Sequence, residues 1–223
     1  MRGDPRYKQL APEQVFSTIY KEGVWGKSDD PSQQFYSGDG SHDNIIVDTY
    51  IGAVRMFLGS FDAKPDVVDL GCGDFSVGSR IRSMCNQYVA CDIVPELVKF
   101  NREKYKSLRV HFMVLDMTRD ELPNGDVVFI RQVFQHMSNK QILSALKKIS
   151  SRYRYLVLSE HVPGEDNFVP NLDMPPGAAT RLYGASGLVL TRRPFNLKVK
   201  NERQLCVAPG NPGKIRTTLY ELS

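Results

Sequence analysis

The chain of 223 residues contains no uninterrupted apolar run long enough to cross a bilayer, and its first residues are polar and charged. A transmembrane helix needs about 20 mainly apolar residues, and a secretory signal peptide needs an apolar stretch near the N-terminus. The sequence shows neither pattern. We therefore expect a soluble, cytoplasmic protein that does not act at a membrane.

Cysteine is scarce as well, with four in the chain and no Cys-x-x-Cys pair. Zinc sites and disulfide frameworks are usually marked by paired or regularly spaced cysteines. Three of the four cysteines lie in apolar or glycine-rich stretches, which predicts reduced thiols and no metal site. The four are Cys72, Cys85, Cys91 and Cys206.

A dense block of basic residues is also missing, although the net charge is +4 and the pI is about 8.8. The lysines and arginines are scattered, so an acidic partner such as a phosphate or a nucleic acid is permitted but not required. We find no internal repeat and no low-complexity run. The hydrophobic share of 41% and the charged share of 24% are ordinary for a globular chain of one domain.

What the sequence does contain is a glycine-rich turn in the stretch Asp66–Ser79. An apolar run from Val67 to Leu70 predicts a buried strand that leads directly into this turn. Gly71 and Gly73 allow the backbone to approach a ligand closely, because neither carries a Cβ. The helix predicted at 77–84 would then point its first N–H groups at whatever the turn holds.

The spacing of the glycines separates two classes of cofactor. The dinucleotide-binding fingerprint has glycines at the first, third and sixth places. Counted from Gly71, the sixth place is Ser76, and the next glycine is Gly78. The pattern therefore disfavours a nicotinamide cofactor.

A second buried strand is predicted over 87–92, and it ends in an acid. Asp92 follows Gly73 at about the offset of 20 residues at which a carboxylate meets the ribose hydroxyls in a βαβ unit. The alternative is that Asp92 caps the helix predicted at 95–105, because Pro95 and Glu96 follow it. The agreement of both spacings favours the ribose contact.

Three more apolar strands are predicted, at 109–115, 124–130 and 155–158, each followed by polar residues. Strands that alternate with helices predict a parallel sheet covered on both faces. The carboxyl ends of such strands lie at one edge, where open α/β sheets bind their ligands. The polar residues at these ends are Asp116, Arg131, Gln132, Glu160 and His161.

These strand ends resemble the class I, Rossmann-like S-adenosylmethionine-dependent methyltransferases, in particular those that act on small molecules. The residues that carry the resemblance are the loop Asp69-Leu-Gly71-Cys-Gly73, the acids that end the next two strands, and the pattern Arg131-x-Val-x-x-His136. The resemblance implies a doubly wound α/β fold with a mostly parallel seven-stranded sheet. It also implies an antiparallel C-terminal hairpin strand and an N-terminal helical cap.

The resemblance further implies S-adenosyl-L-methionine as the cofactor and a set of residues that bind it. Asp116 would accept a hydrogen bond from the exocyclic amine of the adenine, and Met117 would cover the edge of the ring. The usual third glycine of the family falls at Phe75, so the loop departs from the pattern there. The implied cofactor-binding residues are Trp25, Asp69, Gly71, Cys72, Gly73, Phe75, Asp92, Ile93, Asp116, Met117, Arg131 and Gln132.

Two flanking segments are expected to complete the site, and they divide the chain into a cap at 1–42, a cofactor-binding core at 43–160 and a C-terminal part at 161–223. The aromatic, glycine-rich stretch around Tyr36 is either a lid over the ligand, in which Tyr36 would contact the substrate, or an ordinary connection whose tryptophan packs in the core. In the proline-rich insertion that follows the core, Arg181 and Tyr183 either contact an acidic or phenolic substrate or are simply solvated.

The implied reaction is the in-line displacement of a methyl group onto a small molecule or a glycan unit, with a hydroxyl oxygen as the favoured acceptor. His136 is the first candidate for the base, with His161 and Glu160 behind it. The alternative for His136 is a hydrogen bond to a helix end. There are two competing functions: methylation of a protein or an RNA, and binding of the cofactor without catalysis. Direct methylation of nucleic-acid bases is disfavoured, because the family's motif for it is missing after the fourth strand.

Overall fold

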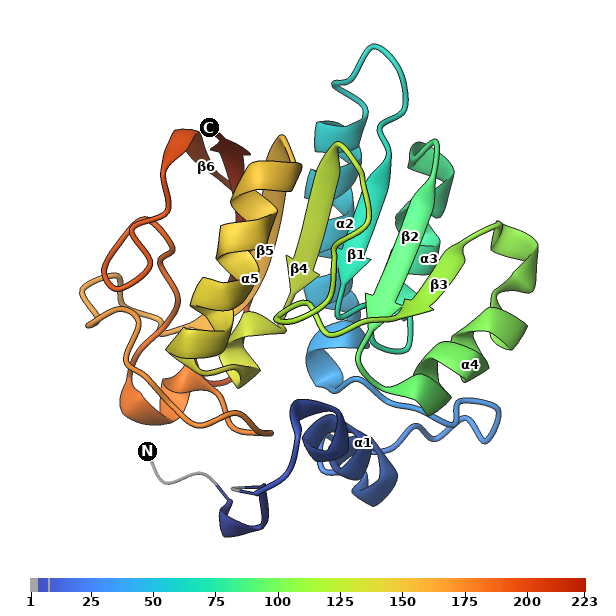
Figure 1. The fold of residues 1–223 in the computed structure, drawn as a ribbon, viewed down its shortest axis with the longest axis horizontal. Coiled ribbons are helices and arrows are strands. Elements are labelled where there is room, and N and C mark those ends of the chain that lie inside the picture. Colours follow the sequence, from blue (N-terminus) through green and yellow to red (C-terminus); the bar gives the residue numbers. More distant parts are fainter. Residues whose placement is uncertain (1–3, 8) are drawn as a thin grey trace.

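The computed structural model describes residues 4–7 and 9–223, and its centre is one sheet of seven strands (Figure 1). The strand order is β3-β2-β1-β4-β5-β7-β6. The first five strands in the chain run parallel to one another, whereas β7 is antiparallel to both β5 and β6. The strands are β1 Val67–Leu70, β2 Tyr88–Asp92, β3 His111–Val114, β4 Val127–Arg131, β5 Tyr155–Val162, β6 Val199–Pro209 and β7 Lys214–Leu222. This confirms the expected fold class.

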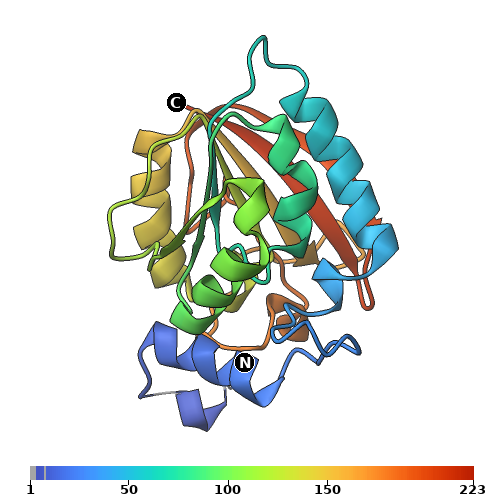
Figure 2. The same ribbon diagram turned by 90° about the vertical axis from the view of Figure 1, so that its right-hand side faces the viewer.

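Helices cover both faces of the sheet, as its buried parallel strands require. On one face, α2 and α3 pack with apolar residues of β1, β2 and β4 into one cluster. On the other face, α5 packs through Ile142, Leu146 and Ile149 together with Leu190 of the insertion. Figure 2 shows the sheet edge-on between these layers. The helices are α1 Pro12–Glu22, α2 Asn44–Leu58, α3 Ser76–Ile81, α4 Pro95–Lys104 and α5 Asn139–Arg152.

The N-terminal segment lies across the carboxyl ends of the parallel strands, where α1 is seen below the arrowheads in Figure 1. Pro12 begins α1, and Gly23 ends it in the left-handed conformation with φ 64°. The buried side chains of α1 are Val15 and Ile19, at helical spacing. This placement is the expected N-terminal cap.

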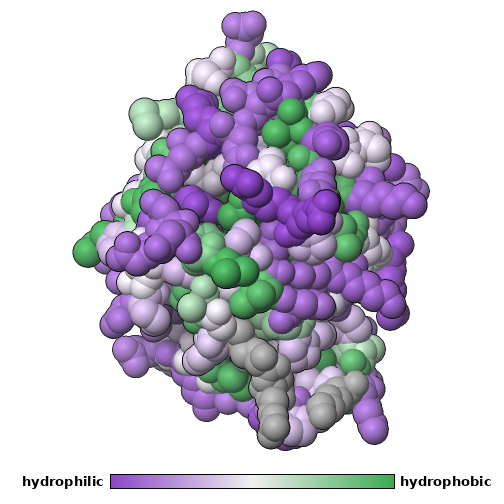
Figure 3. Space-filling model, turned by 90° about the vertical axis from the view of Figure 1, so that its left-hand side faces the viewer, coloured by the Kyte–Doolittle hydropathy of each residue, from purple (hydrophilic) through white to green (hydrophobic). Residues whose placement is uncertain are grey.

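The insertion between β5 and β6 contains no strand, and its backbone is organised by one asparagine. The Asn171 side chain donates to Val189 O at 2.8 Å and accepts from Val189 N at 2.9 Å. The face of the molecule that the insertion forms is mostly hydrophilic, with apolar residues such as Val169 and Leu172 exposed among polar ones (Figure 3). In the part of the chain that the structure describes, no helix is both long and apolar enough to span a membrane.

The predicted element boundaries differ from the observed ones mainly where the backbone leaves its regular conformation. Strand β3 begins at His111 and not at Arg109, because Arg109 has a φ of 52° and cannot extend the strand. Strand β5 continues to Val162 and pairs with β7 over eight residues. The expected boundary at residue 160 therefore falls inside a strand, and the C-terminal hairpin belongs to the same sheet as the core.

Candidate active site

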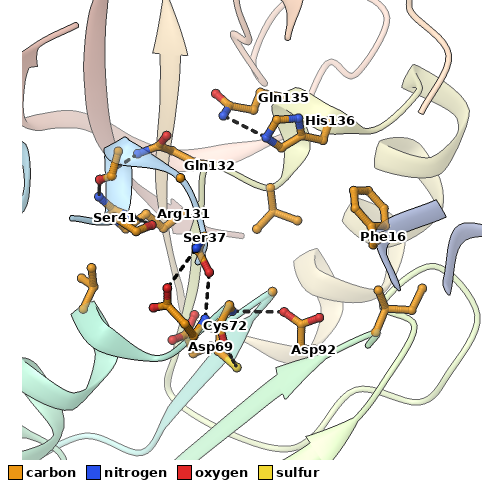
Figure 4. Close-up of a pocket in the computed structure, with 18 of the residues that line it drawn as sticks. Phe16, Ser37, Ser41, Asp69, Cys72, Asp92, Arg131, Gln132, Gln135 and His136 are labelled. Atoms are coloured by element: carbon orange, nitrogen blue, oxygen red, sulfur yellow. Dashed lines mark hydrogen bonds between the residues drawn. The ribbon is translucent and has the colours of Figure 1, made fainter. Parts of the chain in front are cut away.

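A cavity of about 330 Å³ lies at the carboxyl ends of β1, β2, β3 and β4, and the N-terminal segment and the insertion close its other sides. Figure 4 shows its lining residues pointing toward one open space. Eleven of the twelve residues expected to bind a cofactor line it: Trp25, Asp69, Gly71, Cys72, Gly73, Asp92, Ile93, Asp116, Met117, Arg131 and Gln132. The exception is Phe75.

The two glycines of the turn are needed for both backbone conformation and close packing. Gly71 and Gly73 have φ values of 80° and 56°, in the left-handed region that favours glycine. A Cβ on Gly71 would lie 2.5 Å from the Val133 side chain, and one on Gly73 would lie 2.5 Å from Ser37 Oγ. The turn therefore brings bare backbone up to the cavity, as the sequence predicted.

Phe75 does not contact the cavity, and its expected role as a cofactor-binding residue is wrong. It has a φ of 61°, so the backbone keeps the left-handed conformation that a glycine usually provides at this place. Its buried ring packs edge-on against Tyr88, Tyr105 and Phe112, with centroids 5.0 to 5.4 Å apart. A Cβ on Gly78 would overlap this ring. The departure from the family pattern is thus accommodated inside the core, where Gly78 makes room for the ring.

Asp92, at the end of β2, faces the cavity (Figure 4). Its Oδ2 accepts from Gly73 N, and its Oδ1 accepts from Val94 N, both at 3.1 Å. The N-cap of α4 is Val94, so the alternative that Asp92 caps this helix is wrong. Burial raises the pKa of Asp92 to about 6, although the backbone N–H groups oppose the rise. The carboxylate is thus held rigidly, and each oxygen keeps a further lone pair for a ligand.

Asp69 lies deeper, at the end of β1, and is held by the Tyr88 hydroxyl, which donates to Oδ2 at 2.9 Å. Burial raises the pKa of Asp69 to about 7, with Tyr88 and Arg131 opposing the rise. At the end of β3, Asp116 Oδ1 accepts from Thr118 N at 2.8 Å and from Thr118 Oγ1 at 2.6 Å. Three carboxyl groups therefore follow three neighbouring strands around the cavity.

Residues 37–42, which we call the strap, run over the glycine turn and are tied to it by Asp74. Asp74 Oδ2 accepts from Ser37 N at 2.9 Å and lies 2.7 Å from His42 Nε2, while Asp74 N donates to Ser37 Oγ at 2.9 Å. Burial opposes ionisation, but the hydrogen bonds from His42 and Ser76 outweigh it and hold the pKa of Asp74 below its usual range. The strap is therefore attached to the floor of the cavity by a buried carboxylate.

Arg131 ties the strap to β4 at Gly40 and Ser41. Its Nη1 donates to Ser41 Oγ at 3.0 Å, its Nη2 donates to Gly40 O, and its guanidinium lies 5.2 Å from the centroid of the Tyr50 ring. Its Nε is buried without a hydrogen-bond partner among the described residues. An unpaired buried donor is costly, so this group is suited to meeting a ligand oxygen. The strap was expected to be either a lid over the ligand or an ordinary connection, and its position over the cavity agrees with a lid.

His136 lies in the cavity wall, with its ring centroid 5.0 Å from that of Trp25, but neither ring nitrogen is free. Nδ1 lies 3.1 Å from Ala179 O and must carry the proton, because a carbonyl only accepts. Gln135 Oε1 accepts from His161 N at 3.0 Å, so the Gln135 amide nitrogen faces His136 Nε2 at 3.2 Å and donates to it. Burial lowers the pKa of His136 to about 4. The prediction of a free base does not agree with this arrangement.

The two other candidates for the base are also engaged elsewhere. Glu160 does not line the cavity; its carboxylate accepts from Phe134 N at 2.9 Å and from Gln135 N at 3.1 Å. Burial raises the pKa of Glu160 to about 8, although these backbone donors oppose the rise. His161 reaches the cavity, but its Nε2 lies 2.6 Å from Pro212 O. Both residues therefore hold neighbouring loops in place.

The three residues expected to contact the substrate lie away from the cavity. Tyr36 donates to Asp39 Oδ1 at 2.7 Å and stacks on His42. Arg181 is buried and donates to Phe134 O at 2.9 Å, among others, so it anchors the insertion. Tyr183 is 79% exposed. Neither Arg181 nor Tyr183 lines the cavity, so the geometry does not support their expected contact with an acidic or phenolic substrate.

Several lining residues were not foreseen from the sequence, among them Phe16, Ser37, Asp39, Ser41, Gln135 and Thr180. They come from the cap, from the turn after β4 and from the insertion, where no periodic pattern indicates which side chains turn inward. The one local signal was the repetition of small and polar residues in Ser37-Gly-Asp-Gly-Ser41. Such a stretch indicates a close backbone approach and does not say to what.

Comparison with known proteins agrees with this geometry. Residues 67–154 match the family model described as a methyltransferase domain, whereas no curated protein matches the chain in sequence. The N-methyltransferase NodS from Bradyrhizobium japonicum WM9, solved with S-adenosyl-L-homocysteine, is similar with a TM-score of 0.66 and 12% identity, over 93% of this chain and 98% of that one.

Two further solved structures have the same fold. Magnesium protoporphyrin IX methyltransferase from Synechocystis PCC 6803, solved with S-adenosylmethionine, aligns with a TM-score of 0.60 and 14% identity, over 97% of this chain and 99% of that one. Human N-acetylserotonin methyltransferase aligns with a TM-score of 0.59 and 16% identity, over 96% of this chain and 60% of that one. Residues 67–154 thus match a methyltransferase domain, and the chain as a whole shares its fold with solved methyltransferases.

Proposed function

We propose that this enzyme transfers the methyl group of S-adenosylmethionine to a small molecule that binds in the cavity under the strap. The observation that carries the proposal is the arrangement of Asp92. Its carboxylate is held by two backbone N–H groups at the end of β2, next to the bare turn at Gly73, and it faces the cavity. A carboxylate so placed is suited to accepting hydrogen bonds from the two hydroxyls of a ribose.

The other cavity groups fit the remaining parts of the cofactor. The turn at Gly71 and Gly73 leaves space that any Cβ would fill, beside the N-terminal end of α3. The unpaired Nε of Arg131 is the natural partner of the carboxylate on the amino-acid end. Asp116 and Met117 line the cavity beyond Asp92, where the adenine would lie. The residues present therefore fit the cofactor over its whole length.

When bound, S-adenosylmethionine supplies a methyl carbon that is already activated by the attached sulfonium. The protein then has to orient the acceptor behind that carbon and exclude water. The strap closes the cavity through Asp74 and Arg131, and Trp25 and His136 form part of its wall. Enclosure of this kind favours a small acceptor.

The competing function of a non-catalytic, cofactor-binding protein was favoured by the departure at Phe75. Since the Phe75 ring packs into the core and leaves the cavity unchanged, that argument loses its basis. Methylation of a protein or an RNA has no particular observation in its favour. The small-molecule function is therefore the one that the site supports best.

Calorimetry with S-adenosylhomocysteine tests the cofactor site directly. We expect binding to the native chain and a loss of at least about tenfold in affinity in Asp92→Ala, since two charge-assisted hydrogen bonds are removed. Asp48→Ala is the matched control, because Asp48 is exposed and pairs with Arg80 on the surface. Absence of binding to the native chain, or equal affinity in Asp92→Ala, would contradict the proposal. Release of S-adenosylhomocysteine from S-adenosylmethionine with a metabolite mixture then tests for turnover.

A further inference from the structure

We infer that the methyl acceptor is an amine, an inference that rests on the proposed function and deepens it. Three observations carry it: the charges around the cavity, the hydrogen bonds that engage His136 and His161, and the surroundings of Asp39.

The cavity is rich in carboxyl groups, although the protein has a net charge of +4. Among the described lining residues, Arg131 is the only lysine or arginine, and its Nη groups already bind the strap. Its remaining Nε is suited to the carboxylate of the cofactor. A phosphate or carboxylate on the acceptor would thus have no cation to pair with, and its desolvation would cost free energy. The five carboxyl groups are Asp39, Asp69, Asp74, Asp92 and Asp116.

Of the two histidines that line the cavity, His136 has both ring nitrogens engaged and His161 has its Nε2 engaged. His136 donates from Nδ1 to Ala179 O and accepts at Nε2 from Gln135, and the Gln135 amide is itself oriented by the backbone N–H of His161. The His161 ring is bonded to Pro212 O. An alcohol loses its proton too reluctantly to react well without a base, whereas a neutral amine already has a lone pair to offer.

Transfer of the methyl group to an amine also keeps one positive charge in the cavity, next to its carboxyl groups. The amine lone pair forms the bond to the methyl carbon while the carbon–sulfur bond breaks and its electron pair returns to sulfur. The positive charge thereby moves from the sulfonium to the new ammonium, which afterwards releases one proton to water. No oxidant, metal or protein base is needed, and the carboxyl groups stabilise the positive charge before and after the step.

The residues around Asp39 provide a place for the ammonium group. Asp39 is exposed and lines the cavity; on one side Gly38 would bring a Cβ to within 3.7 Å of Trp25, and on the other Gly40 packs against Gln132. Asp39 Oδ1 accepts from Tyr36, and no described residue donates to its Oδ2. A carboxylate with an oxygen left for a ligand, in a cavity that Trp25 also lines, is an arrangement that favours an organic cation.

The test uses three probes with the same phenyl ring and different head groups: phenethylamine, phenethyl alcohol and hydrocinnamate. Trp25 is the single tryptophan of the chain and lines the cavity, so its fluorescence reports on occupancy there. The protein is first saturated with S-adenosylhomocysteine and then titrated with each probe. We expect phenethylamine to bind at least about tenfold more tightly than hydrocinnamate, and more tightly than the alcohol.

The variant Asp39→Asn should lower the affinity for phenethylamine about threefold and leave that for the alcohol unchanged, as removal of a partly exposed charge implies. Asp48→Asn is the control, and neither affinity should change in it. With S-adenosylmethionine and a mixture of amines and alcohols, mass spectrometry should find the methyl group on nitrogen.

Equal or tighter binding of the alcohol or of hydrocinnamate, no binding of phenethylamine, or methylation of oxygen alone would overturn the inference. Each of these results is compatible with tight binding of S-adenosylhomocysteine, which would leave the methyltransferase function intact. Failure of S-adenosylhomocysteine itself to bind would instead overturn the proposed function, and the inference with it.

Discussion

At the scale of single residues, the site is built from carboxyl groups that are costly to bury. Asp69 and Asp92 are both buried, and burial raises the pKa of Asp69 to about 7 and that of Asp92 to about 6. The folded chain without ligand thus holds these protons more tightly than the unfolded chain does. A ligand that donates hydrogen bonds to the carboxylates offsets part of the free energy that their burial costs. A binding site differs from an ordinary core in keeping such groups for a ligand.

The raised pKa of Asp69 predicts a stability effect with a definite sign. For an acid whose pKa is higher in the folded state, unfolding becomes easier as the pH rises from the unfolded value of about 3.9 to the folded value. Asp69→Asn removes the ionisable group while its side-chain oxygen still accepts from Tyr88. We expect the variant without cofactor to be more stable than the native chain above pH 7, by roughly 1 to 3 kcal/mol, and nearly equal to it near pH 4.

Urea unfolding across this pH range measures the effect. Asp62→Asn is the control, since Asp62 is exposed and the change there should not depend on pH. A difference between Asp69→Asn and the native chain that shrinks as the pH rises would contradict the argument. The same variant should bind S-adenosylhomocysteine more weakly, because the site loses a charge that the cofactor uses.

At the scale of elements, the strap is attached to the core by side chains and not by a strand or a helix. The attachment depends on Asp74 under Ser37 and His42, the two ends of the strap, and on Arg131 under Gly40 and Ser41 between them. Elements held by a few polar contacts open more easily than the packed core. The strap is therefore the part that has to move when the cofactor enters or leaves.

Asp74→Ala should release the strap at both Ser37 and His42. Hydrogen bonds to a charged group contribute about 1.5 to 3 kcal/mol each, so S-adenosylhomocysteine should bind at least about tenfold more weakly. Trp25 lies in the same N-terminal segment as the strap and lines the cavity. Its indole should therefore become more accessible to acrylamide, which quenches its fluorescence. Asp48→Ala, in which an equally charged surface residue is removed, should change neither quantity. Unchanged quenching in Asp74→Ala would show that the strap is held by other contacts.

At the scale of the whole molecule, one buried arginine is a main polar connection between the insertion and the core, beside the apolar packing of Leu190. Arg181 donates to Phe134 O, Met137 O and Asn139 Oδ1, at 2.7 to 2.9 Å, and thereby joins the insertion to the turn that carries His136. Gly177 N completes the connection by donating to His136 O at 3.1 Å. The cavity wall and the insertion are thus one structural unit, so a substitution in one of them should affect the structure of the other.

Arg181→Met should therefore destabilise the protein by about 2 to 4 kcal/mol, because it leaves buried carbonyl oxygens without donors. Arg192→Met is the matched control: Arg192 is an exposed arginine of the same insertion, and its replacement should change stability by less than about 0.5 kcal/mol. Urea denaturation compares the two variants. Equal stability of Arg181→Met and Arg192→Met would mean that the insertion does not depend on this connection.

The sequence by itself determined the sheet, the glycine turn and the acids at the strand ends. Apolar runs that end in Gly71, Asp92, Asp116 and Arg131 are local patterns, and the carboxyl ends of parallel strands always meet at one edge. This is why eleven of the twelve residues expected to bind the cofactor line one cavity, and why a few short segments indicated a methyltransferase domain.

Only the tertiary structure decided the roles of Phe75, His136, Glu160 and Arg181. The direction of the Phe75 ring depends on Gly78 and on aromatic residues from other elements. The proton on His136 is placed by a carbonyl far along the chain, at Ala179. Such partners are backbone groups and packing surfaces that every sequence has, so no local sequence pattern predicts these contacts. A reactive side chain read from sequence becomes a base or a structural support according to which distant groups fold against it.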